Sequence, residues 1–98
     1  LALLGWSPPP PKNLAIGGIV EPSVKFKWDE NNDKNIKGYK IYWRETSSPH
    51  WQFSRYVGNI NKYTLDGIII DNYLFSLTSV SNSGYESIFE FPSETFRN

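Results

Sequence analysis

Five consecutive side chains that carry oxygen atoms, Asp29 to Asp33, have the spacing in this 98-residue sequence that comes nearest to a site for chemistry. Oxygen ligands at the first, third and fifth positions of such a segment are typical of the start of a calcium-binding loop. The continuation does not fit, because the sixth position is Lys34, where the loop needs glycine, and the twelfth is Lys40, where it needs glutamate. We therefore predict a solvated loop here rather than a metal site.

The other titratable residues show no catalytic arrangement. His50 is the only imidazole, and a general base needs a nucleophile and an orienting carboxylate within reach, for which the sequence offers no recognisable partner. Asp66 and Asp71 flank three isoleucines, where acids ordinarily form turns. The absence of cysteine excludes disulfides, thiolate catalysis and cysteine-based metal centres. We expect no catalytic residue, no metal and no cofactor in this chain.

Charge and hydropathy argue against two classes of partner. Lys plus Arg and Asp plus Glu number 10 each, so there is no basic excess to bind nucleic acid or anionic lipid. The apolar run at residues 1–6 is about a third of the length that crosses a bilayer, and it lacks the features of a signal peptide. We expect no nucleic-acid partner and no membrane span.

The first residues resemble the end of one element followed by a spacer. Leu1 to Gly5 has the composition of the last turn of a helix, and the proline run at residues 8–11 is typical of a stiff, extended linker. We therefore assign residues 1–9 to the tail of an upstream element and a proline-rich linker, residues 10–92 to the domain, and residues 93–98 to a C-terminal tail. An alternative stays open, in which Leu3, Leu4 and Trp6 fold back onto this domain.

Apolar residues alternate with polar ones in short runs, and no segment shows helical spacing over ten residues. Residues 24–28 are the clearest run, with Val24, Phe26 and Trp28 on one side and two lysines on the other. Turn residues separate the runs. The pattern predicts an all-β, seven-stranded immunoglobulin-like sandwich, with strands at residues 13–16, 24–28, 39–44, 51–56, 62–65, 71–80 and 87–91.

Alternation also divides the aromatic residues, which make up 16% of the chain, between core and surface. The predicted core contains Trp28, Tyr39, Ile41, Trp43, Tyr73, Phe75 and Leu77. The rings left over as a candidate interaction surface are Tyr42, Trp51, Tyr56 and Phe89, with Phe91 as a further surface ring. Three interpretations of these rings stay open: ordinary surface packing, a protein interface, and a flat platform for sugars.

Several short motifs occur in a fixed order: prolines before Leu14, Trp28 at the end of one strand, Gly38-Tyr39 at the start of the next, Tyr73 leading a long strand, and a turn at Gly84. Over residues 10–91 this order resembles a fibronectin type III domain. The resemblance implies a two-sheet sandwich in which the Tyr73 hydroxyl bonds back to upstream backbone. The chain contains no Arg-Gly-Asp tripeptide, so the resemblance implies no integrin-type adhesion.

The resemblance also suggests a setting. The Leu-rich start, the proline linker and the motifs at residues 71–73 and 84–87 resemble the C-terminal accessory domain of bacterial secreted zinc peptidases of the M28 type. This implies an extracellular or periplasmic, non-catalytic interaction and spacer module whose partner is a neighbouring domain of the same polypeptide. The alternative is a free-standing module that binds protein or polysaccharide through exposed aromatic residues.

Overall fold

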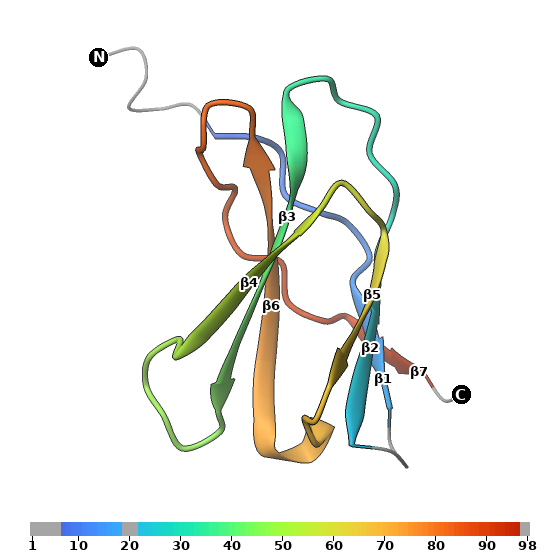
Figure 1. Ribbon diagram of the computed structural model, residues 1–98, viewed down its shortest axis with the longest axis vertical. Helices are drawn as coiled ribbons and strands as arrows, with labels where there is room; N and C mark the ends of the chain where they lie inside the picture. The colour runs from blue at the N-terminus through green and yellow to red at the C-terminus, as the bar shows by residue number, and fades with distance from the viewer. Residues whose placement is uncertain (1–6, 19–21, 97–98) are drawn as a thin grey trace.

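Two β-sheets packed face to face form the protein in the computed structural model, which describes residues 7–18 and 22–96 (Figure 1). One sheet has the strand order β5-β2-β1-β7, and the other has the order β4-β3-β6. The predicted all-β sandwich is confirmed. The elements are β1 (Ala15–Gly17), β2 (Ser23–Lys27), β3 (Ile36–Glu45), β4 (Phe53–Gly58), β5 (Lys62–Asp66), the 3-10 helix η2 (Ile70–Asn72), β6 (Tyr73–Ser81) and β7 (Glu94–Phe96).

Alternating side chains explain why β2 and β3 provide the two inner faces. In β2, Val24 and Phe26 are buried, whereas Lys27 is exposed. In β3, Tyr39 and Ile41 are buried and the intervening Lys40 lies on the opposite face. β3 pairs antiparallel with both β4 and β6, so it is the central strand of its sheet. Its inner residues therefore lie in the middle of the core.

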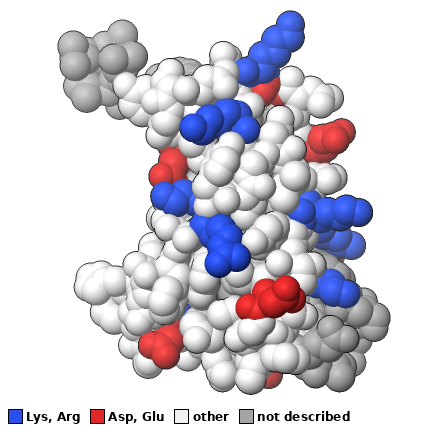
Figure 2. Space-filling model, viewed as in Figure 1, with Lys and Arg blue, Asp and Glu red and all other residues white. Residues whose placement is uncertain are grey.

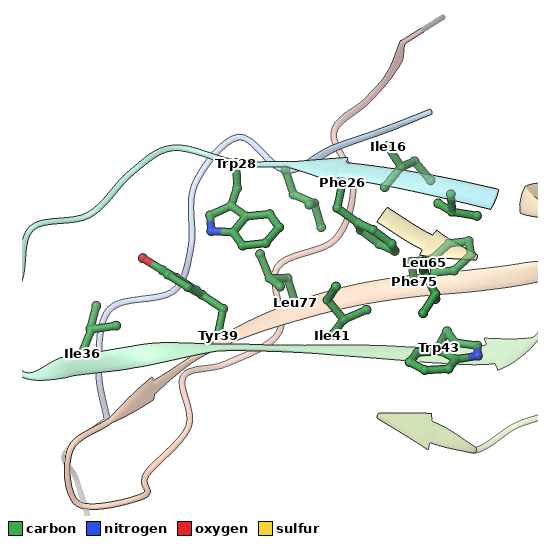
Figure 3. Packing of buried hydrophobic residues seen from close by; sticks show 12 residues of the cluster. Ile16, Phe26, Trp28, Ile36, Tyr39, Ile41, Trp43, Leu65, Phe75 and Leu77 are labelled. Atoms are coloured by element: carbon green, nitrogen blue, oxygen red, sulfur yellow. The ribbon is translucent and has the colours of Figure 1, made fainter. Parts of the chain in front are cut away.

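The core is a cluster of buried side chains from both sheets (Figure 3). Phe26 meets Phe75 edge to face across the sheets with ring centroids 5.4 Å apart, and Trp28 packs on Tyr39 at the same separation. Such geometries suit the charge distribution of aromatic rings. Of the side chains that we placed in the core, Tyr73 is half-buried against the cluster, and the others are buried: Trp28, Tyr39, Ile41, Trp43, Phe75 and Leu77.

The connection before β6 differs from the corner that the resemblance implied. Residues Ile70–Asn72 form the single turn η2, and the Thr46 N–H donates to the Asn72 carbonyl at 3.2 Å. The Tyr73 ring lies 6.4 Å from that of Phe75. Within the described part of the chain, the Tyr73 hydroxyl makes no hydrogen bond to upstream backbone, so the expected tyrosine corner does not form. The 3-10 turn η2 forms the connection to β6 instead.

β6 is buried on both faces, although alternation predicted burial of only one. Phe75 and Leu77 face the core, and Ser76, Thr78 and Val80 on the other face are also buried. The chain after β6 returns along it: Leu77 and Glu90 exchange backbone hydrogen bonds of 3.0 and 2.8 Å. This returning segment covers β6 from Phe75 onward, whereas Leu74 near its start stays exposed.

The last strand lies later in the chain than predicted. Residues 87–91 make one isolated bridge to β6, between Glu90 and Leu77. The seventh strand is β7, inside the region that we assigned to a tail. Pro92 has no N–H with which to continue a ladder. The Ser93 N–H then donates to the Leu14 carbonyl at 2.9 Å, and β7 pairs parallel with β1 in the other sheet. The proline thus marks the point where the chain changes sheets.

The described part of the expected linker packs against the sandwich. Pro8 is fully buried, and the Pro9 carbonyl accepts a 2.5 Å hydrogen bond from the Ser79 hydroxyl. Further along, the Asp29 N–H donates to the Lys12 carbonyl at 2.9 Å. Leu3, Leu4 and Trp6 lie outside the described residues. We propose that the module includes Pro8 and Pro9 and extends beyond residue 92 to Phe96, because β7 pairs with β1.

Candidate functional site

The outer face of the three-stranded sheet, the one turned away from the core, is the candidate site. In β3, Lys40, Tyr42 and Arg44 point outward because they alternate with the core residues. Tyr42 lies opposite Ser54 of β4 and Ser76 of β6 in the sheet register. These two small side chains leave room above the sheet for large rings.

Four rings meet on this face, and we call them the outer aromatic cluster: Tyr42, Trp51, Phe89 and Phe91. Tyr42 meets Phe89 edge to face at 5.2 Å, and Trp51 lies 5.5 Å from Phe89. Phe91 lies 6.3 Å from both Trp51 and Phe89. The cluster joins a central strand, the turn before β4 and the segment after β6, so it links three separate parts of the chain.

Charged side chains frame the cluster. The Arg44 guanidinium lies 5.1 Å from the Trp51 ring centre, and the Lys40 ammonium lies 5.2 Å from that of Tyr42, both within the range of cation–π attraction. Lys40 also forms an ion pair with Glu86, with an N–O distance of 3.7 Å. The attraction of these cations to the electron-rich ring faces therefore helps to fix the Tyr42 and Trp51 rings on the protein surface.

Glu86 fixes the phenol at the centre of this face. Its Oε1 atom accepts hydrogen bonds from the Tyr42 hydroxyl at 2.5 Å and from the Thr78 hydroxyl at 2.9 Å. Burial raises the pKa of Tyr42 above its ordinary value of 10.0, and the hydrogen bond to Glu86 and its negative charge raise it further. Tyr42 thus stays a protonated donor at neutral pH, which suits a positioning role and not that of a base.

The rings form an uneven ridge rather than a flat platform. Phe91 is 57% exposed and Phe89 38%, while Tyr42 and Trp51 are half-buried. The planes of Tyr42 and Phe89 are 84° apart, and only the Trp51–Phe91 pair approaches parallel, at 27°. A sugar chain stacks on coplanar exposed rings, whereas a ridge of exposed apolar edges fits a hollow in a protein surface.

Tyr56, which we had grouped with these rings, lies apart from them on the same face. Its hydroxyl donates to the Lys37 carbonyl at 3.1 Å, and the Lys37 ammonium lies 5.5 Å from its ring centre. The ring covers Gly38, where any Cβ would overlap the Tyr56 hydroxyl. Ordinary surface packing is therefore the interpretation that fits Tyr56. Phe91, and not Tyr56, is the fourth ring of the outer aromatic cluster. Phe89 and Phe91 are two residues apart, and this spacing in the sequence indicates that both rings lie on the same side of an extended segment.

The structure does not bring together the residues that we considered as candidates for catalysis or metal binding. In the acidic loop, the Asp33 carboxylate accepts a turn-forming hydrogen bond from the Asn35 N–H at 2.8 Å. The Asp29 carboxylate accepts from the Asn13 side chain at 2.6 Å, which links the loop to the segment before β1. His50 is exposed in the turn before β4. Asp66 and Asp71 are exposed too. Across residues 7–18 and 22–96, no group of three or more His, Asp or Glu is placed to hold a metal ion.

Surface charge is mixed, with one local excess. Figure 2 shows both signs on the face drawn, with Lys and Arg gathered on the side where β2 and β5 lie in Figure 1. Lys27 of β2 lies directly opposite Lys62 of β5. None of the helical structure in the described ranges is long and apolar enough to cross a membrane.

Comparison with known proteins supports the fold and adds a setting. No protein-family model matches the sequence. A probable zinc metalloprotease of Pyrenophora tritici-repentis is 36% identical over 97% of this chain, and chicken neurofascin is 32% identical over 92% of it. Among solved structures, the fn3 domain of the human collagen alpha-1(XX) chain has a TM-score of 0.68 at 17% identity, covering 91% of this chain and 87% of that one. The chain thus has the fibronectin type III fold.

The chain spans only 23% of the length of the metalloprotease relative and 7% of neurofascin. It is therefore similar to one module within larger polypeptides, including zinc metalloproteases. That metalloprotease comes from a fungus, so it supports the peptidase setting but not the bacterial source that the resemblance suggested.

Proposed function

We propose that this chain is a non-catalytic accessory module of a larger, secreted hydrolase, for which a zinc peptidase is the best-supported class. The observation that carries the proposal is the match of nearly the whole chain to a fraction of a probable zinc metalloprotease. It is consistent with the described residues, among which no three His, Asp or Glu are placed to hold a metal ion. The chemistry would then belong to another part of the polypeptide. An extracellular or periplasmic location belongs to the same proposal.

The outer aromatic cluster is the surface through which the module would contact its neighbouring domain. Exposed Phe89 and Phe91 provide apolar edges, and Arg44 and Lys40 beside them provide charge at the rim. Buried aromatic anchors inside a polar rim are typical of protein interfaces. The Glu86 hydrogen bond holds Tyr42, against which Phe89 packs, before any partner binds, and this lowers the ordering cost of association.

The accessory role can be tested on the longer polypeptide that contains this sequence. We would compare the intact protein with a variant lacking residues 7–96 and measure zinc content and hydrolysis of a short soluble peptide. Both should survive the deletion, and the 98-residue chain alone should show neither. Loss of zinc from the deletion variant, or hydrolysis by the isolated chain, would contradict the proposal.

The docking surface needs its own variant. Trp51→Ala with Phe89→Ala should weaken binding between the isolated chain and the remainder of the polypeptide, measured by calorimetry. Ile88→Ala is the matched control, because Ile88 is 71% exposed and is not one of the four rings of the cluster. Equal affinities for the unchanged chain, the double variant and the control would show that the cluster is not part of the interface.

A second candidate is a free-standing module that binds protein or polysaccharide through the same rings. The same cluster supports it, and the uneven ring planes favour a protein ligand over a stacked sugar chain. Retained zinc and peptidase activity with no affinity between module and remainder would favour this candidate.

A further inference from the structure

A hollow opens at one end of the sandwich, lined by residues that are not part of the outer aromatic cluster. It lies between the loop after β2 and the loop after β4 and has a volume of about 410 Å³, within the range of about 300–1,000 Å³ that is typical of small-ligand sites. Four asparagines line it, and we call it the asparagine hollow: Asn31, Asn32, Asn59 and Asn61.

Tyr39 lies at the inner end of this hollow. The side chain is 1% exposed, and its hydroxyl has no hydrogen-bond partner among residues 7–18 and 22–96. Trp28 packs against it, and the Trp28 indole N–H is likewise buried and unpartnered within these residues. Figure 3 shows the Tyr39 oxygen and the Trp28 nitrogen directed away from Ile41 and Leu77, toward the loop end. Two buried polar groups of this kind cost stability unless something pairs with them.

Charge on the walls balances. Glu30 and Lys62 both line the hollow, and they carry opposite signs. Burial and the negative charge of Glu30 raise the pKa of Tyr39, which keeps its hydroxyl protonated and able to donate. A charged ligand would therefore gain little affinity from the net charge of the walls. A neutral polar ligand would meet both hydrogen-bond donors and hydrogen-bond acceptors.

The loops around the hollow are held in place. The backbone N–H of Trp28 donates to the Asn61 carbonyl at 3.0 Å, and this bond links the two loops. The Asn82 side chain donates to the Lys34 carbonyl at 2.9 Å, and the Asp33 N–H donates to the Asn31 side-chain oxygen at 2.9 Å. A preformed site loses less entropy when a ligand binds.

We propose that the asparagine hollow binds one residue of a neutral sugar. Each asparagine amide offers a planar pair of one acceptor and one donor group, which matches adjacent hydroxyls that both donate and accept. Glu30 adds an acceptor and Lys62 a donor. An apolar ligand would leave these groups unpaired, and the hollow has Ile60 as its one aliphatic wall in the described chain, too little to anchor a peptide side chain.

The test is a titration of the ¹⁵N-labelled 98-residue chain, followed by NMR, with cellohexaose, maltohexaose and chitohexaose. At least one sugar should shift the side-chain amides of the four asparagines and the Trp28 indole N–H in a saturable way. The Trp51 indole N–H and the backbone N–H groups of the outer aromatic cluster should not respond. Failure of all three sugars at millimolar concentration, or shifts confined to the outer aromatic cluster, would overturn the proposal.

Variants separate binding from folding. Asn32→Ala with Asn59→Ala should weaken sugar affinity by about tenfold or more, because several hydrogen bonds are lost. Asn72→Ala, in the exposed turn η2, is the matched control and should keep the affinity. Tyr39→Phe should weaken binding while its midpoint of thermal unfolding stays equal or rises, since the ring remains and an unpartnered hydroxyl leaves. Stronger shifts with tetraglycine than with any sugar would assign the hollow to peptides instead and overturn the proposal.

Discussion

Each face of β3 carries a tyrosine, and the two tyrosines lie in very different surroundings. On the inner face, Tyr39 and Ile41 are 1% and 0% exposed and meet the opposite sheet. On the outer face, Tyr42 and Arg44 lie among rings and charges that remain partly open to water. The inner face packs against its own chain, whereas the outer face shows exposed apolar edges next to cations. An aromatic residue therefore has no fixed role in this fold, because its register position decides whether it builds the core or the surface.

Truncation on the inner face should give the largest effect. Ile41→Ala removes a fully buried side chain from the centre of the core and should lower the free energy of unfolding by about 2–5 kcal/mol. Guanidinium unfolding followed by tryptophan fluorescence measures it. A loss below about 1 kcal/mol would mean that the core collapses around the missing atoms and would weaken the contrast between faces.

Gly38→Ala tests a place on the outer face where two residues pack closely. A Cβ there would overlap the Tyr56 hydroxyl and approach the backbone of Gly58, so the sheet has to shift. We expect a loss of about 1–3 kcal/mol in the same unfolding measurement. Tyr56→Ala added to Gly38→Ala should restore only part of it, because the Gly58 backbone remains; complete restoration would assign the whole clash to Tyr56.

Trp51→Ala removes a central ring of the outer aromatic cluster. It removes the ring contacts with Tyr42, Phe89 and Phe91. Because these rings are partly exposed, the free energy of unfolding should fall by only about 1–2 kcal/mol. Ile88→Ala serves as the control and should change stability by no more than about 0.5 kcal/mol. A loss as large as that of Ile41→Ala would show that the outer rings are part of the core.

Alkaline pH should reveal the smallest difference. The pKa of Tyr42 is higher in the folded chain than the ordinary 10.0, so its contribution to stability is complete below pH 10 and is lost as the pH rises toward the folded value. Tyr39, whose pKa is also raised, acts in the same direction. Tyr42→Phe should therefore flatten, without abolishing, the fall in unfolding free energy above pH 10, and Ile88→Ala should leave the slope unchanged. An unchanged slope for Tyr42→Phe would contradict the role of the Glu86 hydrogen bond.

Much of the fold was predictable because period-two alternation is a local signal. The runs at Val24 to Trp28 and Tyr39 to Arg44 specify which face is buried, and the structure follows them. What alternation cannot report is contact between segments distant in sequence. The second buried face of β6 depends on the chain returning beside it, and the switch of sheets after Pro92 depends on hydrogen bonds to Leu14.

The candidate site was predictable only in part, for the same reason. Tyr42, Trp51 and Phe89 were identified as surface rings, yet Tyr56 was grouped with them because sequence does not show that it lies over Gly38. Glu86, which positions Tyr42, is 44 residues away along the chain and gave no sequence signal. Long-range partners of this kind emerge only when the strands are paired.

The most direct test of the distinction between the two faces is the unfolding free energy of Trp51→Ala with Phe89→Ala beside that of Ile41→Ala. We predict that the double variant unfolds in one cooperative transition with an unchanged denaturant dependence and loses about 2–3 kcal/mol, no more than the single core truncation. A double variant that fails to fold, or that loses clearly more than Ile41→Ala, would show that the outer aromatic cluster is needed for the fold and is not a surface held ready for a partner.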